Sequence, residues 1–138
     1  IDLAKSQTNE NPVYYIQYAH ARICSMLRNL ATRNLTLDAD EGRKHVECLE
    51  GPHITPLLNE IARFPESVAH AAKHLEPHTI AHYLKELATH LHAFYHHTEK
   101  LHALPEADRQ ARGYLLLAVR QVLRNGLALL GVSAPETM

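Results

Sequence analysis

The sequence predicts an all-α fold, a single helical bundle of about five helices that takes in residues 1–138 as one domain. Apolar residues recur at helical spacing in the longest segments, and prolines stand where helices are expected to begin. No segment alternates apolar and polar residues as a half-buried strand does. With 46% hydrophobic residues in 138, the chain can bury one core, which these helices must build by packing on one another.

The first helix is expected from Pro12 to about Arg33. Proline suits the first helical position because its missing N–H has no partner there, and Asn11 is a typical N-cap residue. One face of this helix is apolar and carries Ile16, Ile23, Leu27 and Leu30.

The segment 34–53 is rich in charge and contains Gly42, Gly51 and Pro52, so it is expected to be a loop. Two short helices are expected after it, one over residues 55–64 and the other over residues 65–75. Pro65 marks the start of the second, and Thr55 is the expected N-cap of the first.

Two long helices complete the bundle. One runs from Pro77 to about His97, and its apolar face carries Ile80, Leu84, Leu87, Leu91 and Phe94. The other runs from about Glu106 to Leu130 and stops at Gly131. Its expected apolar face carries Leu115, Ala118, Val122 and Leu129, and close helix packing is expected at Gly113 and Gly126.

The totals exclude several classes of protein. The formal net charge is −1, so a nucleic-acid-binding surface has to be local rather than a property of the whole chain. Two cysteines make no disulfide framework and indicate reduced thiols in the cytoplasm. The longest apolar run, YLLLAV, is too short to span a membrane. Because the chain opens on Ile1, we expect it to be a piece excised from a longer protein.

The first helix carries polar chemistry opposite its apolar face, at Tyr14, Tyr18, Arg22 and Ser25. Tyrosine offers a flat stacking surface, and arginine offers a planar fork of donors, which together suit an unpaired base and its phosphate. The alternative is that a second layer of the protein covers this face. His20 falls on the apolar side and is expected to be a satisfied core or interface histidine.

Twelve histidines raise the possibility of a metal site. Three pairs have the i,i+4 spacing that can present two imidazoles to one ion: His70/His74, His78/His82 and His92/His96. No HExxH motif or nearby cysteine pair completes a ligand set, and His92 and His96 are expected on a polar face. A surface that responds to pH is therefore preferred to a metal centre, and no metal ligand is assigned.

Arg120 and Arg124 lie four residues apart on the polar side of the last helix. They could form a phosphate-binding strip, or they could simply belong to a solvated face. The chain has no glycine-rich phosphate loop, nucleophile elbow or pair of catalytic carboxylates, so the sequence predicts no active site.

Three long motifs resemble one known family. They are NPVYYIQYAHARICSMLR, EPHTIAHYLKELATHLHAFY and LAVRQVLRNGLALLGVSAPETM. They resemble the C-terminal, or DALR, anticodon-binding domain of bacterial arginyl-tRNA synthetases, which are class I enzymes. The resemblance implies a helical domain that binds the anticodon stem-loop of arginine tRNA. It also implies a cytoplasmic parent enzyme whose separate catalytic domain joins arginine to tRNA with ATP and Mg²⁺, while this domain has no catalytic site or cofactor.

The resemblance also implies individual roles. Tyr18 in QYAHAR, Tyr95 in HAFYHH and the terminal Met138 match family residues that face the anticodon bases. Basic side chains are expected to position the tRNA backbone, and the candidates are Arg22, Arg28, Arg120 and Arg124.

Two departures from the family pattern affect these roles. The chain has FYHHT at 94–98 where many relatives have FYN-x-C, which changes local loop contacts. It ends in ETM where relatives commonly end in ERM, which removes a basic side chain beside Met138. The alternative function is a helical protein-interaction or metal-binding bundle without any RNA role, in which replacing Tyr18 or Tyr95 would leave tRNA affinity unchanged.

Overall fold

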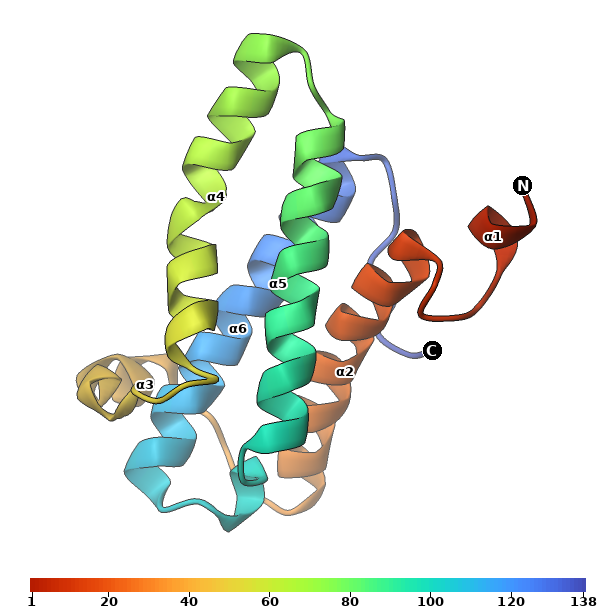
Figure 1. Cartoon of the computed structure of the whole chain (residues 1–138). Helices are drawn as coiled ribbons and strands as arrows, with labels where there is room; N and C mark the ends of the chain where they lie inside the picture. Colours follow the sequence, from red (N-terminus) through yellow and green to blue (C-terminus); the bar gives the residue numbers. More distant parts are fainter.

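A computed structural model describes residues 1–138 and confirms the all-α bundle (Figure 1). The bundle consists of four long helices: α2 (Pro12–Thr32), α4 (Thr55–His74), α5 (His78–His97) and α6 (Glu106–Leu129). The remaining elements are short: α1 (Asp2–Lys5), α3 (Ala39–Lys44) and the 3₁₀ turns η1 (Val46–Cys48) and η2 (Leu101–Ala103). None of the helices combines the length and the apolar content needed to cross a membrane.

Helix α6 is the centre of the packing, since it contacts α2, α3, α4 and α5. All five residues predicted for the apolar face of α5 are buried, and so are Ile16, Ile23 and Leu30 of α2. Gly126 lets α6 and α5 approach closely, because a Cβ there would lie 2.5 Å from a methyl carbon of Leu84. Gly113 has the same relation to Leu37, so both glycines serve close packing as expected.

The segment 55–75 corrects one expectation, because α4 is one continuous helix rather than two. Pro65 lies inside it and is exposed, so water can satisfy the backbone group that proline leaves unpaired. Packing holds the two halves in line, with the rings of Phe64 and of Tyr83 in α5 in tilted contact, 5.4 Å between their centres. Thr55 is the first residue of α4 and makes no side-chain cap, in contrast to Asn11, which accepts a bond from the Val13 N–H.

A second correction concerns the expected loop 34–53, which contains α3 and η1. Asp38 caps α3 by accepting bonds from the N–H groups of Asp40 and Glu41. Acidic residues stand in the first turn of α3 and basic ones in the last, as the helix dipole favours. Gly42 then brings α3 against α6, where a Cβ would lie 2.5 Å from the Cβ of Tyr114.

The predicted apolar face of α6 was partly wrong: Leu115 is buried and Val122 packs against the core, but Ala118 and Leu129 do not belong to it. Leu129 is 57% exposed, and Ala118 and Val122 are only partly buried. The buried positions are Leu115, Leu116, Val119, Leu123, Gly126 and Leu127. Neighbours contact α6 from several sides, so a single stripe does not describe its burial.

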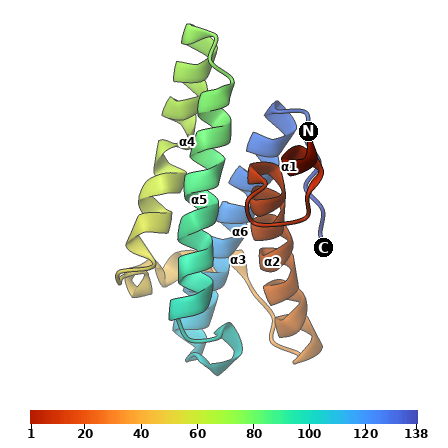
Figure 2. The same ribbon diagram turned by 45° about the vertical axis from the view of Figure 1, so that its right-hand side comes forward.

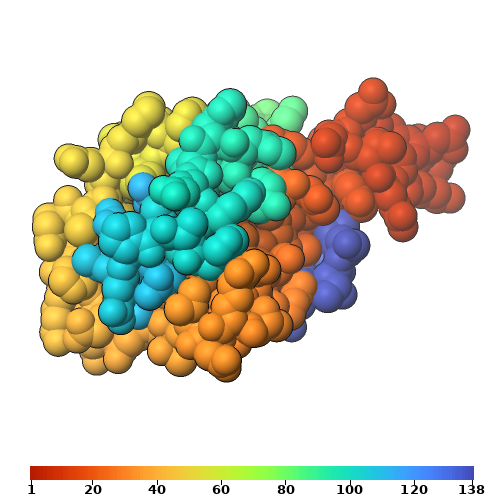
Figure 3. Space-filling view, turned by 90° about the horizontal axis from the view of Figure 1, so that it is seen from below, coloured from red at the N-terminus to blue at the C-terminus, as the bar shows by residue number.

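Both chain ends lie beside α2 (Figures 1 and 2). Residues 1–8 project from the body of the molecule (Figure 3). Asn11 joins this segment to α2, since its amide donates to the carbonyls of Ala4 and Ser6. At the other end, Gly131 adopts a φ of 70° and stops α6, as predicted. Residues 132–138 form a tail that returns along α2.

Candidate nucleic-acid interface

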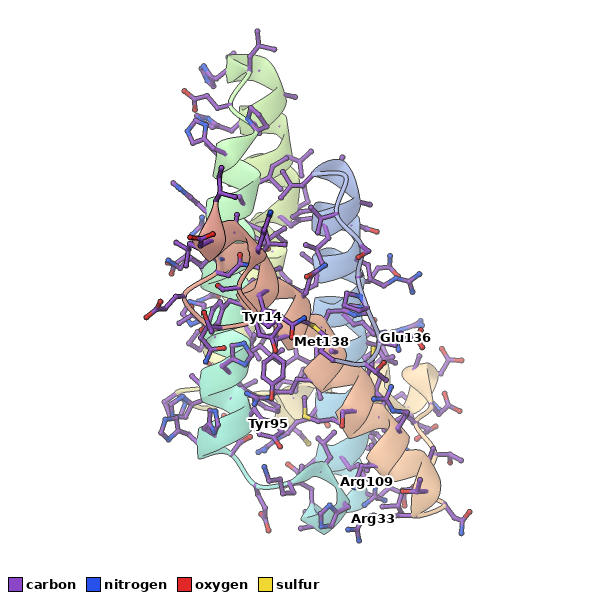
Figure 4. All side chains as sticks on the ribbon, turned by 90° about the vertical axis from the view of Figure 1, so that its right-hand side faces the viewer. Tyr14, Arg33, Tyr95, Arg109, Glu136 and Met138 are labelled. Carbon is purple, nitrogen blue, oxygen red and sulfur yellow. The ribbon has the colours of Figure 1, made fainter.

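A groove of about 520 Å³ opens between α2, the end of α5, η2 and the tail. Five of the seven candidate residues line it, and they come from three separate parts of the chain: Tyr18, Arg22, Arg28, Tyr95 and Met138. Figure 4 shows Tyr14, Met138 and Tyr95 following one another along this face. The other two candidates, Arg120 and Arg124, belong to α6 and do not line the groove.

Arg22 joins the two candidate tyrosines. Its guanidinium carbon lies 4.7 Å from the ring centre of Tyr18 and 4.1 Å from that of Tyr95. Its Nη2 also donates to the Tyr18 hydroxyl at 3.1 Å. Because each cation–π contact contributes on the order of 1 kcal/mol, Arg22 fixes the positions of both rings.

His92 supports Arg22 from α5. Arg22 Nη1 donates to His92 Nδ1 at 2.8 Å, so this nitrogen carries no proton. Burial of the ring, together with the neighbouring positive charge of Arg22, lowers the pKa of His92 to about 4. The expectation that His92 lies on a polar face was wrong: it is 9% exposed, and the ring of Tyr15 packs on it at 4.7 Å.

This contact shows how much of the polar face of α2 is covered within the chain. The face is half covered, because α5 packs on Tyr18 and Arg22 through His92 and Tyr95. Ser25, farther along the same face, is exposed and lines the groove. The groove is therefore the open edge of a polar contact between α2 and α5.

Lys100 is a groove residue that the sequence analysis missed. Its Nζ lies 3.9 Å from the ring centre of Tyr95, so a second cation contacts this ring. The available signal was its position, five residues after Tyr95 in the polar link HTEKLHALPEAD. The chain turns back at the end of α5, where the hydroxyl of Thr98 donates to the carbonyl of Phe94.

The tail brings Met138 to the groove. Three side chains of α2 donate to its carbonyl oxygens: Gln17 to Ser133 at 2.9 Å, His20 to Pro135 at 2.8 Å and Arg28 to Glu136 at 3.1 Å. His20 is 2% exposed, which confirms that it is a core histidine; its Nδ1 bonds to the tail, while its Nε2 is buried without a partner. Arg28 is exposed at the groove, and Met138 is 50% exposed.

Arg120 and Arg124 act on His20 rather than on the groove. Burial lowers the pKa of His20, and the positive charges of Arg124 and Arg120 lower it further, against the raising effect of its bond to Pro135. The structure therefore separates these two arginines from the other candidates for backbone contact.

No three His, Cys, Asp or Glu side chains gather in a group that could hold a metal ion. The rings of His70 and His74 lie 4.4 Å apart, and those of His78 and His82 lie 5.8 Å apart, but each pair stands without a third ligand. In the pair His92/His96, the Nδ1 of His92 is occupied by Arg22.

Comparisons with known proteins agree with the resemblance read from the motifs. The model of the DALR anticodon binding domain family matches residues 16–138. The chain is 56% identical over its whole length to an arginine–tRNA ligase of Legionella pneumophila and 51% identical to one of Thioalkalivibrio sulfidiphilus. It spans 23% of the length of each of these relatives.

Solved structures give the same result. The arginyl-tRNA synthetase of Thermus thermophilus matches with a TM-score of 0.73 and 32% identity, over 98% of this chain and 22% of that one. A Campylobacter jejuni structure matches with a TM-score of 0.80 and 27% identity, over 99% of this chain and 29% of that one. The chain belongs to the DALR anticodon-binding domain family and is homologous over its whole length to arginine–tRNA ligases.

Proposed function

We propose that residues 1–138 are the anticodon-binding domain of an arginine–tRNA ligase and that the groove receives unpaired bases of the anticodon loop of arginine tRNA. The observation that carries this proposal is the meeting of Tyr18, Tyr95 and Met138 at one groove with cationic side chains around it. Family membership supports the same function, since the family is defined by anticodon binding.

In this proposal the bases stack on Tyr18 and Tyr95. Stacking on an aromatic side chain contributes about 1–3 kcal/mol per base, and it tolerates any base because each has a π face. Met138 adds an apolar, adaptable contact at the wall of the groove. Arg22 holds the two rings from within and is assigned a positioning role in place of the backbone contact expected from the sequence.

Arg28 and Lys100 are the proposed contacts to the tRNA backbone, because both are exposed and line the groove. Arg120 and Arg124 are not assigned this role, because they lie outside the groove. With a formal net charge of −1, the chain offers phosphate only this local attraction. Affinity should therefore fall as salt concentration rises, with a slope that reflects few neutralised phosphates.

The wider assignment follows from the relatives. The longer protein is proposed to attach arginine to its tRNA in the cytoplasm with ATP and Mg²⁺, through a catalytic domain outside residues 1–138. The groove carries no nucleophile with an adjacent base, so its proposed contribution is binding and selection of tRNA. The rival function, a protein-interaction or metal-binding bundle, has no observation in its favour among the groove residues.

The test is binding of the chain to an arginine-tRNA anticodon stem-loop, compared with the same RNA carrying a replaced central cytosine. Replacement should weaken binding if the groove reads this base. Tyr95→Ala should lower the affinity about 5- to 150-fold, whereas Tyr95→Phe should keep most of it because the stacking surface remains. Equal affinity of wild type and Tyr95→Ala for both RNAs would refute the proposal.

A matched pair of arginine variants tests the backbone contacts. Arg28→Gln removes a charge at the groove and should reduce both the affinity and its salt dependence. Arg124→Gln removes the same charge from an exposed position outside the groove and should leave both nearly unchanged. Equal effects of the two variants would mean that only the total charge matters.

A further inference from the structure

The tail is held to α2 by side chains that bind its backbone. The three bonds from Gln17, His20 and Arg28 all end on tail carbonyl oxygens, so they fix the path of the tail whatever its side chains are. Figure 4 shows the tail crossing α2 between Glu136 and Met138.

His20 makes the one of these three bonds that is partly buried, since the other two are exposed. It is 2% exposed, while Gln17 is partly exposed and Arg28 is exposed. A carbonyl oxygen can only accept, so His20 Nδ1 carries the proton and donates it to Pro135. Because it is less exposed to water, this bond is stronger than the bonds from Gln17 and Arg28. Loss of the His20 donor would leave the Pro135 carbonyl without its partner in the chain.

The position of this bond along the tail limits where Met138 can lie. Met138 is the seventh residue after Gly131, where α6 has stopped, and seven residues could reach about 24 Å in extended form. Met138 is only the third residue after Pro135, and three residues reach about 10 Å. Since accessible volume scales as the cube of the reach, docking at Pro135, compared with a tail held only at Gly131, reduces the volume open to Met138 by up to about tenfold. The exposed bond from Arg28 to Glu136 lies still nearer to Met138 and adds to this hold.

We propose that His20 is a positioning residue, which docks the tail through Pro135 and so holds Met138 at the groove before RNA arrives. The consequence for RNA rests on the proposed function of the groove, but the docking does not. Preorganisation of this kind removes an ordering cost that binding would otherwise carry. Losing it should weaken anticodon binding by up to about tenfold, in line with the volume that Met138 would regain.

Methionine labelling tests the docking directly. The chain has two methionines, Met26 and Met138, and both line the groove, so a ¹³C-methyl-methionine spectrum contains two signals. His20→Leu fills the site without a donor, and we expect the Met138 signal to narrow and move to the position of a solvent-exposed methionine. The Met26 signal should stay dispersed and so report that the bundle is folded.

His20→Asn is the matched control. Its side-chain amide can place an N–H near the position of Nδ1, so the Met138 signal and the RNA affinity should remain close to wild type. A Met138 signal that is unchanged in His20→Leu would overturn the proposal, and so would equal loss in both variants with a folded Met26 signal.

The wild-type chain offers a check that needs no variant. Long-range ¹H–¹⁵N spectra should show a proton on His20 Nδ1 and a bare Nε2 at pH 7.5. A proton on Nε2 instead would overturn the proposal even if His20→Leu failed to fold. If Met138 undocks in His20→Leu but neither this variant nor Tyr95→Ala changes RNA affinity, the positioning role stands and the proposed function of the groove fails.

Discussion

Mild acid should destabilise the bundle through one histidine, His92. An ordinary histidine has a pKa of 6.5, while burial and the nearby Arg22 lower the pKa of His92 to about 4. The unfolded chain therefore binds a proton below pH 6.5 that the folded chain refuses until about pH 4. The stability contributed by this difference is complete above pH 6.5 and is lost as the pH falls through about 4.

The size of the effect follows from the shift in pKa. The pKa of His92 falls from 6.5 to about 4, and at about 1.4 kcal/mol per unit this gives about 3 kcal/mol in all. Between pH 7.5 and pH 5 the expected loss is about 2 kcal/mol, because the folded state begins to accept the proton only near its own pKa. His92 is 9% exposed, so solvent does little to reduce this loss of stability. Against a total stability of about 5–15 kcal/mol, such a loss is easily measured.

The assay is urea unfolding at pH 7.5 and at pH 5.0 for wild type and His92→Asn. Asparagine can offer its side-chain oxygen where Nδ1 accepts from Arg22, and it does not titrate. The other eleven of the twelve histidines are the same in both proteins, so their contribution cancels in the comparison. Wild type should lose about 2 kcal/mol more than the variant between the two pH values. The same loss in both proteins would refute the assignment of a buried, neutral His92.

Three further substitutions test the fold by urea or thermal unfolding and hydrogen exchange. Gly42→Ala should lower the free energy of unfolding by about 1–3 kcal/mol, because its Cβ would lie 2.6 Å from the Gln110 carbonyl oxygen; an unchanged value would show that α3 can shift on α6. Leu75→Gly should raise the free energy of unfolding by about 1 kcal/mol, because Leu75 is 86% exposed and adopts a left-handed φ of 56° that glycine adopts without strain. A lower free energy of unfolding in this variant would contradict this reasoning. Asn11→Ala removes the N-cap of α2 and two hydrogen bonds to the N-terminal segment. It should lower the free energy of unfolding by about 1–2 kcal/mol and speed amide exchange in residues 1–8. Unchanged exchange in residues 1–8 would show that Asn11 does not hold this segment.

The long helices could be predicted from the sequence because their signals are local. The predicted start of α2 at Pro12 is confirmed, and its predicted end at Arg33 lies one residue beyond the observed Thr32. Asn11 and Gly131 act at the helix ends where their chemistry placed them. Capping and proline rules depend on a few neighbouring residues, so they hold without knowledge of the fold.

The corrections arise where tertiary contacts decide. Helix α4 continues through Pro65 because Pro65 faces water, while Phe64 beside it packs on Tyr83 of α5. The N-cap Asp38 and the charge pattern of α3 were present in the sequence, but Gly42 made the segment look like a loop. Gly42 is needed because α6 packs closely against it, and the local sequence does not show this contact.

The candidate site shows the same limit in a more instructive form. Projection of each helix by itself placed Arg22 of α2 and His92 of α5 on polar faces directed toward water. In the structure the two polar faces meet, and Arg22 donates to Nδ1 of His92, which is buried. Tyr18 and Tyr95 are held at the margin of this contact, and the tail closes the groove from outside.

This arrangement explains how a chain with a formal net charge of −1 would present the proposed RNA surface already formed. A polar seam between two helices is costly to bury unless its groups are paired, and here a neutral histidine accepts from an arginine that also contacts two aromatic rings. Arg22 contacts the rings of Tyr18 and Tyr95, and Lys100 also contacts the ring of Tyr95. In the proposed function, the rigidity of the binding surface thus depends on the internal bonds of Arg22 and His20, while the exposed Arg28 and Lys100 are the proposed source of attraction to phosphate.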